Sequence, residues 1–184
     1  MIIENLENQL LVAMPKLHDP NFFQSVVYLC EHNANGAIGI IINIPLQIKF
    51  NDVLQHLKIT VEKASEQDIP ILMGGPVGKD QGFIIYTDAA EFAVNEKIKI
   101  GVSSSKKMLL ELSNGDGPKH ALIALGFASW GGGQLEQELA NNYWIIAPAD
   151  PRLIFSTPFE QRWRKAAALV GVDFHRLSWD VGHG

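Results

Sequence analysis

The chain has 184 residues, of which 47% are hydrophobic and 19% charged, and its formal net charge is −5. This composition excludes a disordered or fibrous protein, and the length suits one domain with a substantial core, so we expect residues 1–184 to form a single domain. An acidic chain repels a phosphate backbone, and all four arginines lie after residue 150. Direct nucleic-acid binding is therefore not expected without a local basic patch.

Cysteine usage and the chain start indicate the compartment. Cys30 is the single cysteine, so no internal disulfide is possible, which fits a reducing compartment. The first residues carry Glu4 and Glu7 and lack the basic region of a secretory signal. The apolar runs are shorter than the ~20 residues that cross a bilayer. We expect a cytoplasmic protein that does not associate with membranes.

The first part of the chain predicts strands around a hairpin. Residues 10–14 form a short apolar strand, and strands at 25–32 and 37–43 flank a four-residue loop, Asn33–Gly36. Because the third strand is apolar on both faces, we place it at the centre of the sheet. The spacing of apolar residues in 50–57 predicts a helix.

The middle of the chain alternates short strands with turns. We expect a strand at 69–73, a turn at 78–82, a strand at 83–87 and a further strand within 91–102. A serine among residues 103–105 caps a helix that Gly115 closes.

The last part contains a strand, a glycine turn and helices. The apolar run 120–126 predicts a buried strand, and a helix follows the glycines Gly131–Gly133. A strand is expected at 143–147, and Thr157–Glu160 reads as a capping box opening a helix that runs to about residue 170, before an irregular tail. The irregular order of helices and strands predicts an α+β fold with a mixed, mainly antiparallel sheet and flanking helices.

The segment Gly74–Asp80 superficially matches a phosphate-binding loop. Its glycine spacing is one residue short, Pro76 lacks a backbone N–H donor, and Asp80 stands where a hydroxyl should hold magnesium. We therefore interpret the segment as a turn at the end of a strand.

The glycine turn before the third helix is the first candidate site, with Trp130, Gly131, Gly133, Gln134 and Glu136. Backbone N–H groups at such a turn can contact a ligand, but Glu136 and its neighbour Glu138 complement the helix dipole and repel phosphate. A ligand here would be cationic or neutral and polar. We favour the other interpretation, a purely structural turn in which Trp130 fills the edge of the core.

A second polar set combines His18 and Asp19 with a strand on which Tyr28, Cys30 and His32 share one face. A Cys–His pair can provide a thiol nucleophile or metal ligands, but spacing assigns no third, orienting group. Zinc templates and the Gly-x-Ser-x-Gly motif are absent from the sequence. We expect neither a metal nor a cofactor.

The helix after Thr157 carries Arg162, Arg164 and Lys165 around Trp163. Such a helix can face nucleic acid or an acidic partner. We favour the interpretation that its basic residues form a solvated face.

Taken together, the sequence resembles the AlgH/YqgE family, a bacterial family labelled as transcriptional regulators and without an established reaction. The matching motifs, in chain order, are Leu11–Pro15 with Asp19, Pro20 and Phe22, Ser25–Val26, Gly39–Asn43 with Pro45, Gly74–Val77, Gly82–Phe83, Gly126, Trp130–Gly131, Gly133–Glu136, Trp144, Ala147–Pro148, Asp150, Phe155, Trp163, Gly171–Asp173, Leu177–Ser178 and Gly182–His183. Each motif alone is weak, whereas the ordered set is specific. The resemblance implies a compact α/β domain in the cytoplasm.

The chain departs from the family pattern at five positions, Ile44, Gln81, Tyr86, Phe127 and Gly132. Ile44 and Gln81 replace common arginines, so an anion site beside Asn43 or Gly82 would be weakened here.

Three hypotheses follow from these residues. The favoured one is a regulatory or interaction protein without catalytic machinery, which binds a protein partner or a small ligand. The alternatives are an enzyme of unknown type that uses polar residues at strand ends, including Cys30, and a direct DNA-binding regulator. The candidate binding residues are His18, Asp19, His32, Asn43, Trp130, Gly131, Gly133, Gln134 and Glu136.

Overall fold

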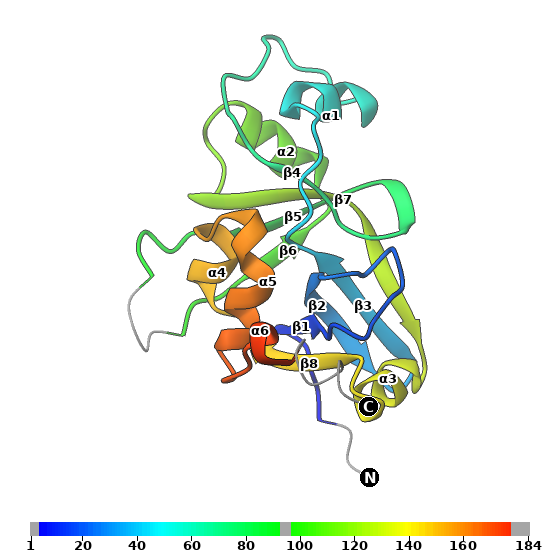
Figure 1. Ribbon diagram of the computed structural model, residues 1–184. Helices are drawn as coiled ribbons and strands as arrows, with labels where there is room; N and C mark the ends of the chain where they lie inside the picture. Colours follow the sequence, from blue (N-terminus) through cyan, green and yellow to red (C-terminus); the bar gives the residue numbers. More distant parts are fainter. Residues whose placement is uncertain (1–3, 93–96, 178–184) are drawn as a thin grey trace.

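A computed structural model describes residues 4–92 and 97–177 (Figure 1). Its strands are β1 (Gln9–Ala13), β2 (Val26–Asn33), β3 (Gly36–Ile41), β4 (Ile71–Met73), β5 (Val77–Thr87), β6 (Gly101–Ser103), β7 (His120–Gly131) and β8 (Trp144–Pro148). Its helices are α1 (Phe50–His56), α2 (Lys106–Ser113), α3 (Gln134–Ala140), α4 (Pro151–Phe155), α5 (Phe159–Ala168) and α6 (Phe174–Leu177).

The strands form one eight-stranded sheet in the order β6-β5-β7-β3-β2-β1-β8, with β4 paired to β7 outside this path. The β4–β7 pairing is parallel, and the neighbours along the path pair antiparallel. The predicted α+β class with a mainly antiparallel sheet is confirmed, and β3 holds the predicted central place.

Strand β7, 12 residues long, joins the two halves of the sheet. Its first part pairs with β4 and β5, and its last four residues pair with β3. Where β4 ends, the backbone passes very close to β7, since a Cβ built on Gly75 would lie 2.1 Å from the carbonyl carbon and oxygen of Phe127. Glycine is therefore required at this crossing.

Three apolar clusters stabilise the two faces and the far end of the sheet. Alternation along β1 puts Leu10 and Val12 in a cluster with α4, α5 and α6, while Leu11 and Ala13 face a cluster with α3. Helices α1 and α2 share the third cluster with β4, β5 and β7. In Figure 1, α4–α6 lie together on one side and α1 and α2 lie at the end opposite α3.

Several predicted boundaries were wrong. The hairpin loop has two residues rather than four, because Asn33 already pairs with Gly36. The predicted turn at 78–82 lies inside β5. Its glycines lie where the pairing register of β5 with β7 shifts, between Val77 and Gly82. The strand expected within 91–102 begins at Gly101, and residues 93–96 of that prediction lie outside the described residues.

The end of the chain contains more helix than its pattern indicated. The predicted capping box at Thr157 does not form: Pro158 is the N-cap of α5, and the Thr157 hydroxyl donates to the carbonyl of Arg152 in α4. The short helices α4 and α6 were not predicted, since neither is long enough to show a helical period. Residues 178–184 of the predicted irregular tail lie outside the described part.

Candidate functional site

The predicted strand–glycine turn–helix element is confirmed at Trp130–Glu136. Gly133 is the N-cap of α3 with φ +77°, a left-handed conformation that favours glycine. The Gln134 side chain folds back, and its Oε1 accepts a hydrogen bond from the Gly131 N–H at 3.0 Å. The turn is thus closed by its own first helical residue.

Glu138 joins α3 to two strands through two buried tryptophans. Its Oε2 accepts hydrogen bonds from Nε1 of Trp130 at 3.0 Å and from Nε1 of Trp144 at 2.8 Å. Its Oε1 accepts from Gln134 Nε2 at 3.0 Å. The tryptophans are 4% and 2% exposed, and their rings meet edge to face. One carboxylate therefore satisfies both buried indole N–H groups.

His32 is buried at the end of β2, and both of its ring nitrogens are hydrogen-bonded. Nε2 lies 2.7 Å from Oε1 of Glu136, and Nδ1 accepts from the backbone N–H of Leu6 at 3.1 Å. Partial burial raises the pKa of the Glu136 carboxyl, but hydrogen bonds from its own backbone and from His32 outweigh this, and the net pKa lies below its usual value.

We call His32, Trp130, Gln134, Glu136 and Glu138 the α3 lock. Of the predicted site residues, the structure brings His32, Trp130, Gly131, Gly133, Gln134 and Glu136 together here. Their polar groups bond mainly to each other, so the lock holds α3 and the end of β2 in fixed positions. Both ring nitrogens of His32 are engaged in hydrogen bonds within the protein, so the ring is not positioned as a base toward a substrate.

The loop between β1 and β2 carries the predicted residues His18 and Asp19. Both are exposed, and Asp19 Oδ1 accepts from the N–H of Asn21 at 2.9 Å, which forms a local turn. Phe22 anchors the loop, because its ring packs on Trp130 and Trp144 at centroid distances of 6.0 and 5.6 Å. These two predicted residues thus lie apart from the α3 lock but on a loop attached to it.

Asn43 fixes the other end of this loop. Its Oδ1 accepts from the N–H of Val26, and its Nδ2 donates to the carbonyl of Gln24, both at 2.9 Å. Gln24 has φ +54°, which is uncommon outside glycine and needs such support. Because Phe22 points inward and Gln24 is fixed, the intervening Phe23 is left 53% exposed.

Beside Phe23 the surface is hollowed against α5 and α6. A cavity of about 550 Å³ lies between Phe23, Asn43 and the exposed side of α5. A smaller one of about 240 Å³ shares four lining residues with it and continues toward Phe174. We call the two together the α5 groove. The residues that line both hollows are Phe23, Gln24, Trp163 and Arg164.

The basic residues of α5, which were expected to form a solvated face, lie in two different environments. Arg164 and Lys165 are exposed, but Arg162 is 2% exposed and donates to the carbonyls of Thr157 and Ile42 at 2.9 and 2.7 Å. Its guanidinium also lies over the Phe159 ring. Burial lowers the pKa of Arg162 to about 10, so the group remains charged at neutral pH. The prediction of a solvated face was therefore wrong for Arg162.

Cys30 and His32 do not share a face of β2, contrary to expectation. The register with β3 shifts between Leu29 and Glu31, and this bulge leaves Cys30 against the cluster of Tyr28 while His32 bonds to Leu6 of the opposite cluster. Burial raises the pKa of the Cys30 thiol to about 12. The thiol therefore stays protonated at neutral pH, which does not suit a nucleophile.

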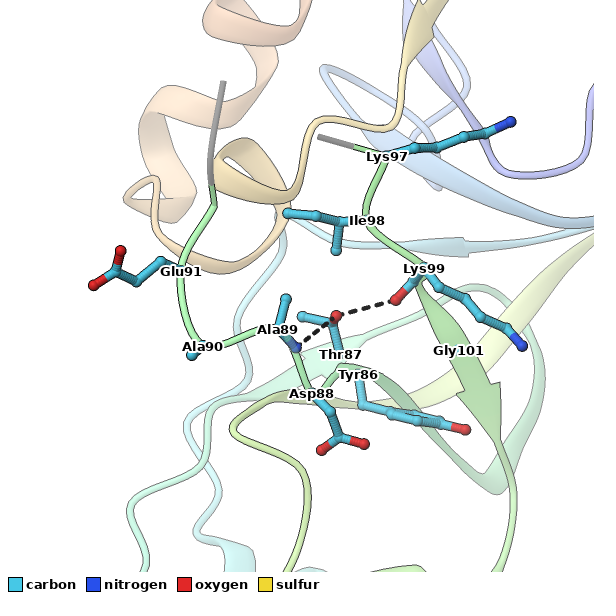
Figure 2. Close-up of a pocket in the computed structure, with 10 residues that line it drawn as sticks. All are labelled: Tyr86, Thr87, Asp88, Ala89, Ala90, Glu91, Lys97, Ile98, Lys99 and Gly101. Carbon is cyan, nitrogen blue, oxygen red and sulfur yellow. Dashed lines mark hydrogen bonds between the residues drawn. The ribbon is translucent and has the colours of Figure 1, made fainter. Parts of the chain in front are cut away.

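A further hollow of about 710 Å³, larger than the main cavity of the α5 groove, lies elsewhere, between the end of β5 and the start of β6. There Thr87 Oγ1 donates to the Lys99 carbonyl and accepts from the Ala89 N–H (Figure 2). The Glu91 and Lys97 side chains extend away from each other in this view. No predicted site residue lines this hollow.

Among residues 4–92 and 97–177, no group of three or more His, Cys, Asp or Glu side chains is placed to hold a metal ion. Within the same ranges, no helix has the length and apolar character needed to cross a membrane.

Sequence reasoning missed Glu138 and the groove residues Phe23 and Gln24. Glu138 looked like a solvent-facing charge on an amphipathic helix. The adjacent aromatics Phe22 and Phe23 did carry a signal, since a short loop rarely buries two consecutive large rings. The partners on α5 were too far along the chain for any pattern to place them beside that loop.

The fold and site define an α+β protein with an open, mainly antiparallel sheet and a hydrogen-bonded lock around α3. The chain belongs to the AlgH-like family, whose family model matches residues 10–175. It is 46% identical to a UPF0301 protein of Thioalkalivibrio sulfidiphilus over 181 residues, with 97% of each chain covered. It is also 46% identical to the UPF0301 protein YqgE of Escherichia coli over 185 residues, covering 97% of this chain and 99% of YqgE.

Solved structures agree with this family. The solution structure of the AlgH protein from Pseudomonas aeruginosa superposes with a TM-score of 0.77 at 40% identity, covering 100% of this chain and 98% of AlgH. The crystal structure of a Corynebacterium diphtheriae protein gives a TM-score of 0.68 at 19% identity over 90% of this chain and 87% of that one, which shows the shared fold alone.

Proposed function

We propose that this protein is a non-catalytic regulatory protein that binds a partner protein in the α5 groove. The observation that carries the proposal is Phe23, which at 53% has the highest exposure of the large hydrophobic residues in the described part. It stands between two hollows rather than on a flat surface. Exposed aromatic side chains beside a hollow are typical anchors of protein interfaces.

The groove is held ready for a partner. Phe22 anchors the loop to Trp130 and Trp144, and Asn43 fixes Gln24 in its left-handed conformation. A surface fixed in advance loses little conformational entropy when it binds. The α3 lock and Asn43 then contribute by positioning the loop between β1 and β2. The predicted site residues thus support partner binding by holding this loop in place.

The chemistry of the groove indicates the kind of partner. The smaller hollow is lined largely by apolar groups, including Pro15, Trp163 and Phe174, and it suits an apolar side chain. Arg164 and Lys165 stand on the rim of the larger hollow, opposed by Glu160 alone among the acidic residues that line it. The partner segment that fits carries an aromatic or aliphatic side chain next to a carboxylate.

The two alternatives have less support. In the candidate constellation for an enzyme, Cys30 is held protonated and His32 has no ring nitrogen left for a substrate. For direct DNA binding, burial removes Arg162 from the basic helix, and Arg164 and Lys165 share their rim with Glu160. Two exposed cations provide few of the phosphate contacts on which binding to a nucleic-acid backbone depends.

Selection from a random peptide library tests this proposal on the purified protein. We expect peptides that combine Asp or Glu with an adjacent apolar residue, and a loss of affinity of about 30-fold for Phe23→Ala and for Arg164→Glu, as for interface hot spots. Lys106→Glu, at the exposed first residue of α2, is the matched charge control and should bind normally. Peptides that bind wild type and both groove variants equally would contradict the proposal.

A further inference from the structure

The first described residues are held against β2 by a set of hydrogen bonds. The Leu6 N–H donates to Nδ1 of His32 at 3.1 Å, and Oε1 of Glu7 accepts from the backbone N–H of His32 at 3.3 Å. Asn8 donates its N–H to the Leu29 carbonyl and accepts from the Tyr28 hydroxyl at 2.7 Å. We call residues 5–8 the N-terminal clasp. Its Leu6 side chain is 7% exposed and belongs to the cluster of Trp130 and Trp144.

The bond from Leu6 fixes where the imidazole proton lies. A backbone N–H can only donate, so Nδ1 of His32 must accept with its lone pair. The proton of the neutral ring is then on Nε2, which donates to Oε1 of Glu136 at 2.7 Å. The ring thus joins the clasp on one side to α3 on the other, and each link uses a different nitrogen.

A second proton on the ring affects these two links in opposite directions. It can bind only at Nδ1, where it removes the acceptor of Leu6 and sets two N–H donors against each other at the present 3.1 Å separation. The Nε2–H bond to Glu136 becomes charge-assisted and therefore stronger. Protonation thus breaks the link of the ring to the clasp and strengthens its link to α3, while the bond from the His32 backbone to Glu7 is unaffected.

The charged neighbours of His32 favour this exchange. Glu136 faces the ring from α3, Glu7 contacts its backbone from the clasp, and Glu31 is adjacent on β2. Glu138 on α3 is occupied by the two tryptophans, and the cross-strand partner on β3 is Ala37, which does not titrate. On β7, Trp130 lies opposite Ala37 and has no titrating group either. The neighbours named here contribute carboxylates and no cation.

We propose that His32 is a proton-operated latch that closes the N-terminal clasp when neutral and releases it when charged. Release uncovers the apolar site of Leu6 and the hydroxyl of Tyr28, while the sheet and α3 stay in place. The signal is a proton, because the neutral ring offers one lone pair and that lone pair is the acceptor of Leu6. The latch is independent of partner binding in the α5 groove.

Amide hydrogen exchange of the full chain, read by NMR, tests the latch. We compare the protection factor of the Leu6 amide, corrected for intrinsic exchange, at about pH 8 and about pH 5. It should fall about tenfold in acid, as expected for the loss of one hydrogen bond. The amide of Val12 in β1 should keep its protection, because global unfolding is not involved.

His32→Gln is the matched control, since glutamine offers both an acceptor and a donor but takes up no proton. Its Leu6 protection should not depend on pH. Glu136→Gln removes the carboxylate that stabilises the charged ring, and the transition should move to lower pH.

The wild type alone also decides the question if a variant does not fold. The ¹⁵N shift of Nδ1 should change from that of an acceptor to that of a protonated nitrogen in the same pH range in which Leu6 loses protection. Constant Leu6 protection in the wild type, or an equal fall in His32→Gln, would overturn the latch.

Discussion

Gly75→Ala is expected to lower the free energy of unfolding by at least about 4 kcal/mol or to prevent recovery of folded protein. A Cβ at this position lies 2.1 Å from the carbonyl carbon and oxygen of Phe127 and 2.5 Å from the N of Ala128. These are backbone atoms of β7, so no side chain can rotate away, and the β4–β7 pairing must shift instead. Losses above ~4 kcal/mol are exceptional and take most of the stability of an ordinary domain.

Gly133→Ala separates this clash from backbone strain. Gly133 also has positive φ, at +77°, but nothing lies within 4 Å of an added Cβ. We expect a loss of about 1 kcal/mol there, the cost of placing alanine in a left-handed conformation. Urea unfolding of both variants measures the difference. Equal losses in the two variants would mean that β4 does not cross β7 as closely as described.

Glu138→Ala is expected to cost about 2–4 kcal/mol, the largest effect that we expect among the polar side chains of the α3 lock. The change leaves the indole N–H groups of Trp130 and Trp144 without their acceptor, at about 1–3 kcal/mol for each buried donor, less what entering water recovers. Glu138→Gln keeps a carbonyl oxygen for the two indoles and should lose only about 1 kcal/mol.

Gln137→Ala, on the exposed side of the same helix, is the matched control and should change stability by less than about 0.5 kcal/mol. Urea unfolding followed by tryptophan fluorescence reads the stability and the indole environment together. If Glu138→Ala matched Gln137→Ala, the carboxylate would not be what holds α3 to the two strands.

Local patterns were sufficient for much of the fold. The hairpin, the central position of β3 and the turn from β7 into α3 follow from alternation, apolar runs and glycines that act within a few residues. The bulge at Cys30 was not predictable in the same way, because it depends on how β2 and β3 pair. That one displaced residue separated Cys30 from His32 and removed the predicted Cys–His pair.

The candidate site was predicted only in part, for a related reason. Residues near one another in sequence, from Trp130 to Glu136, were identified because a glycine turn before a helix is a local feature. Arg162 looked solvent-exposed because no sequence pattern shows that the Ile42 carbonyl accepts from it across the core. The α5 groove joins Phe23 to Trp163 and Arg164, and only tertiary packing brings them together.

Site-specific photo-crosslinking in the native host tests the central claim most directly. A photoreactive residue at Gln24, on the rim of the α5 groove, should yield a defined protein adduct, whereas the same residue at Lys106 on α2 should not. The adduct should disappear when Phe23→Ala is added, because the partner then loses its apolar contact. No adduct from position 24, or one that persists without the Phe23 ring, would show that the groove is not the surface through which this protein binds a partner.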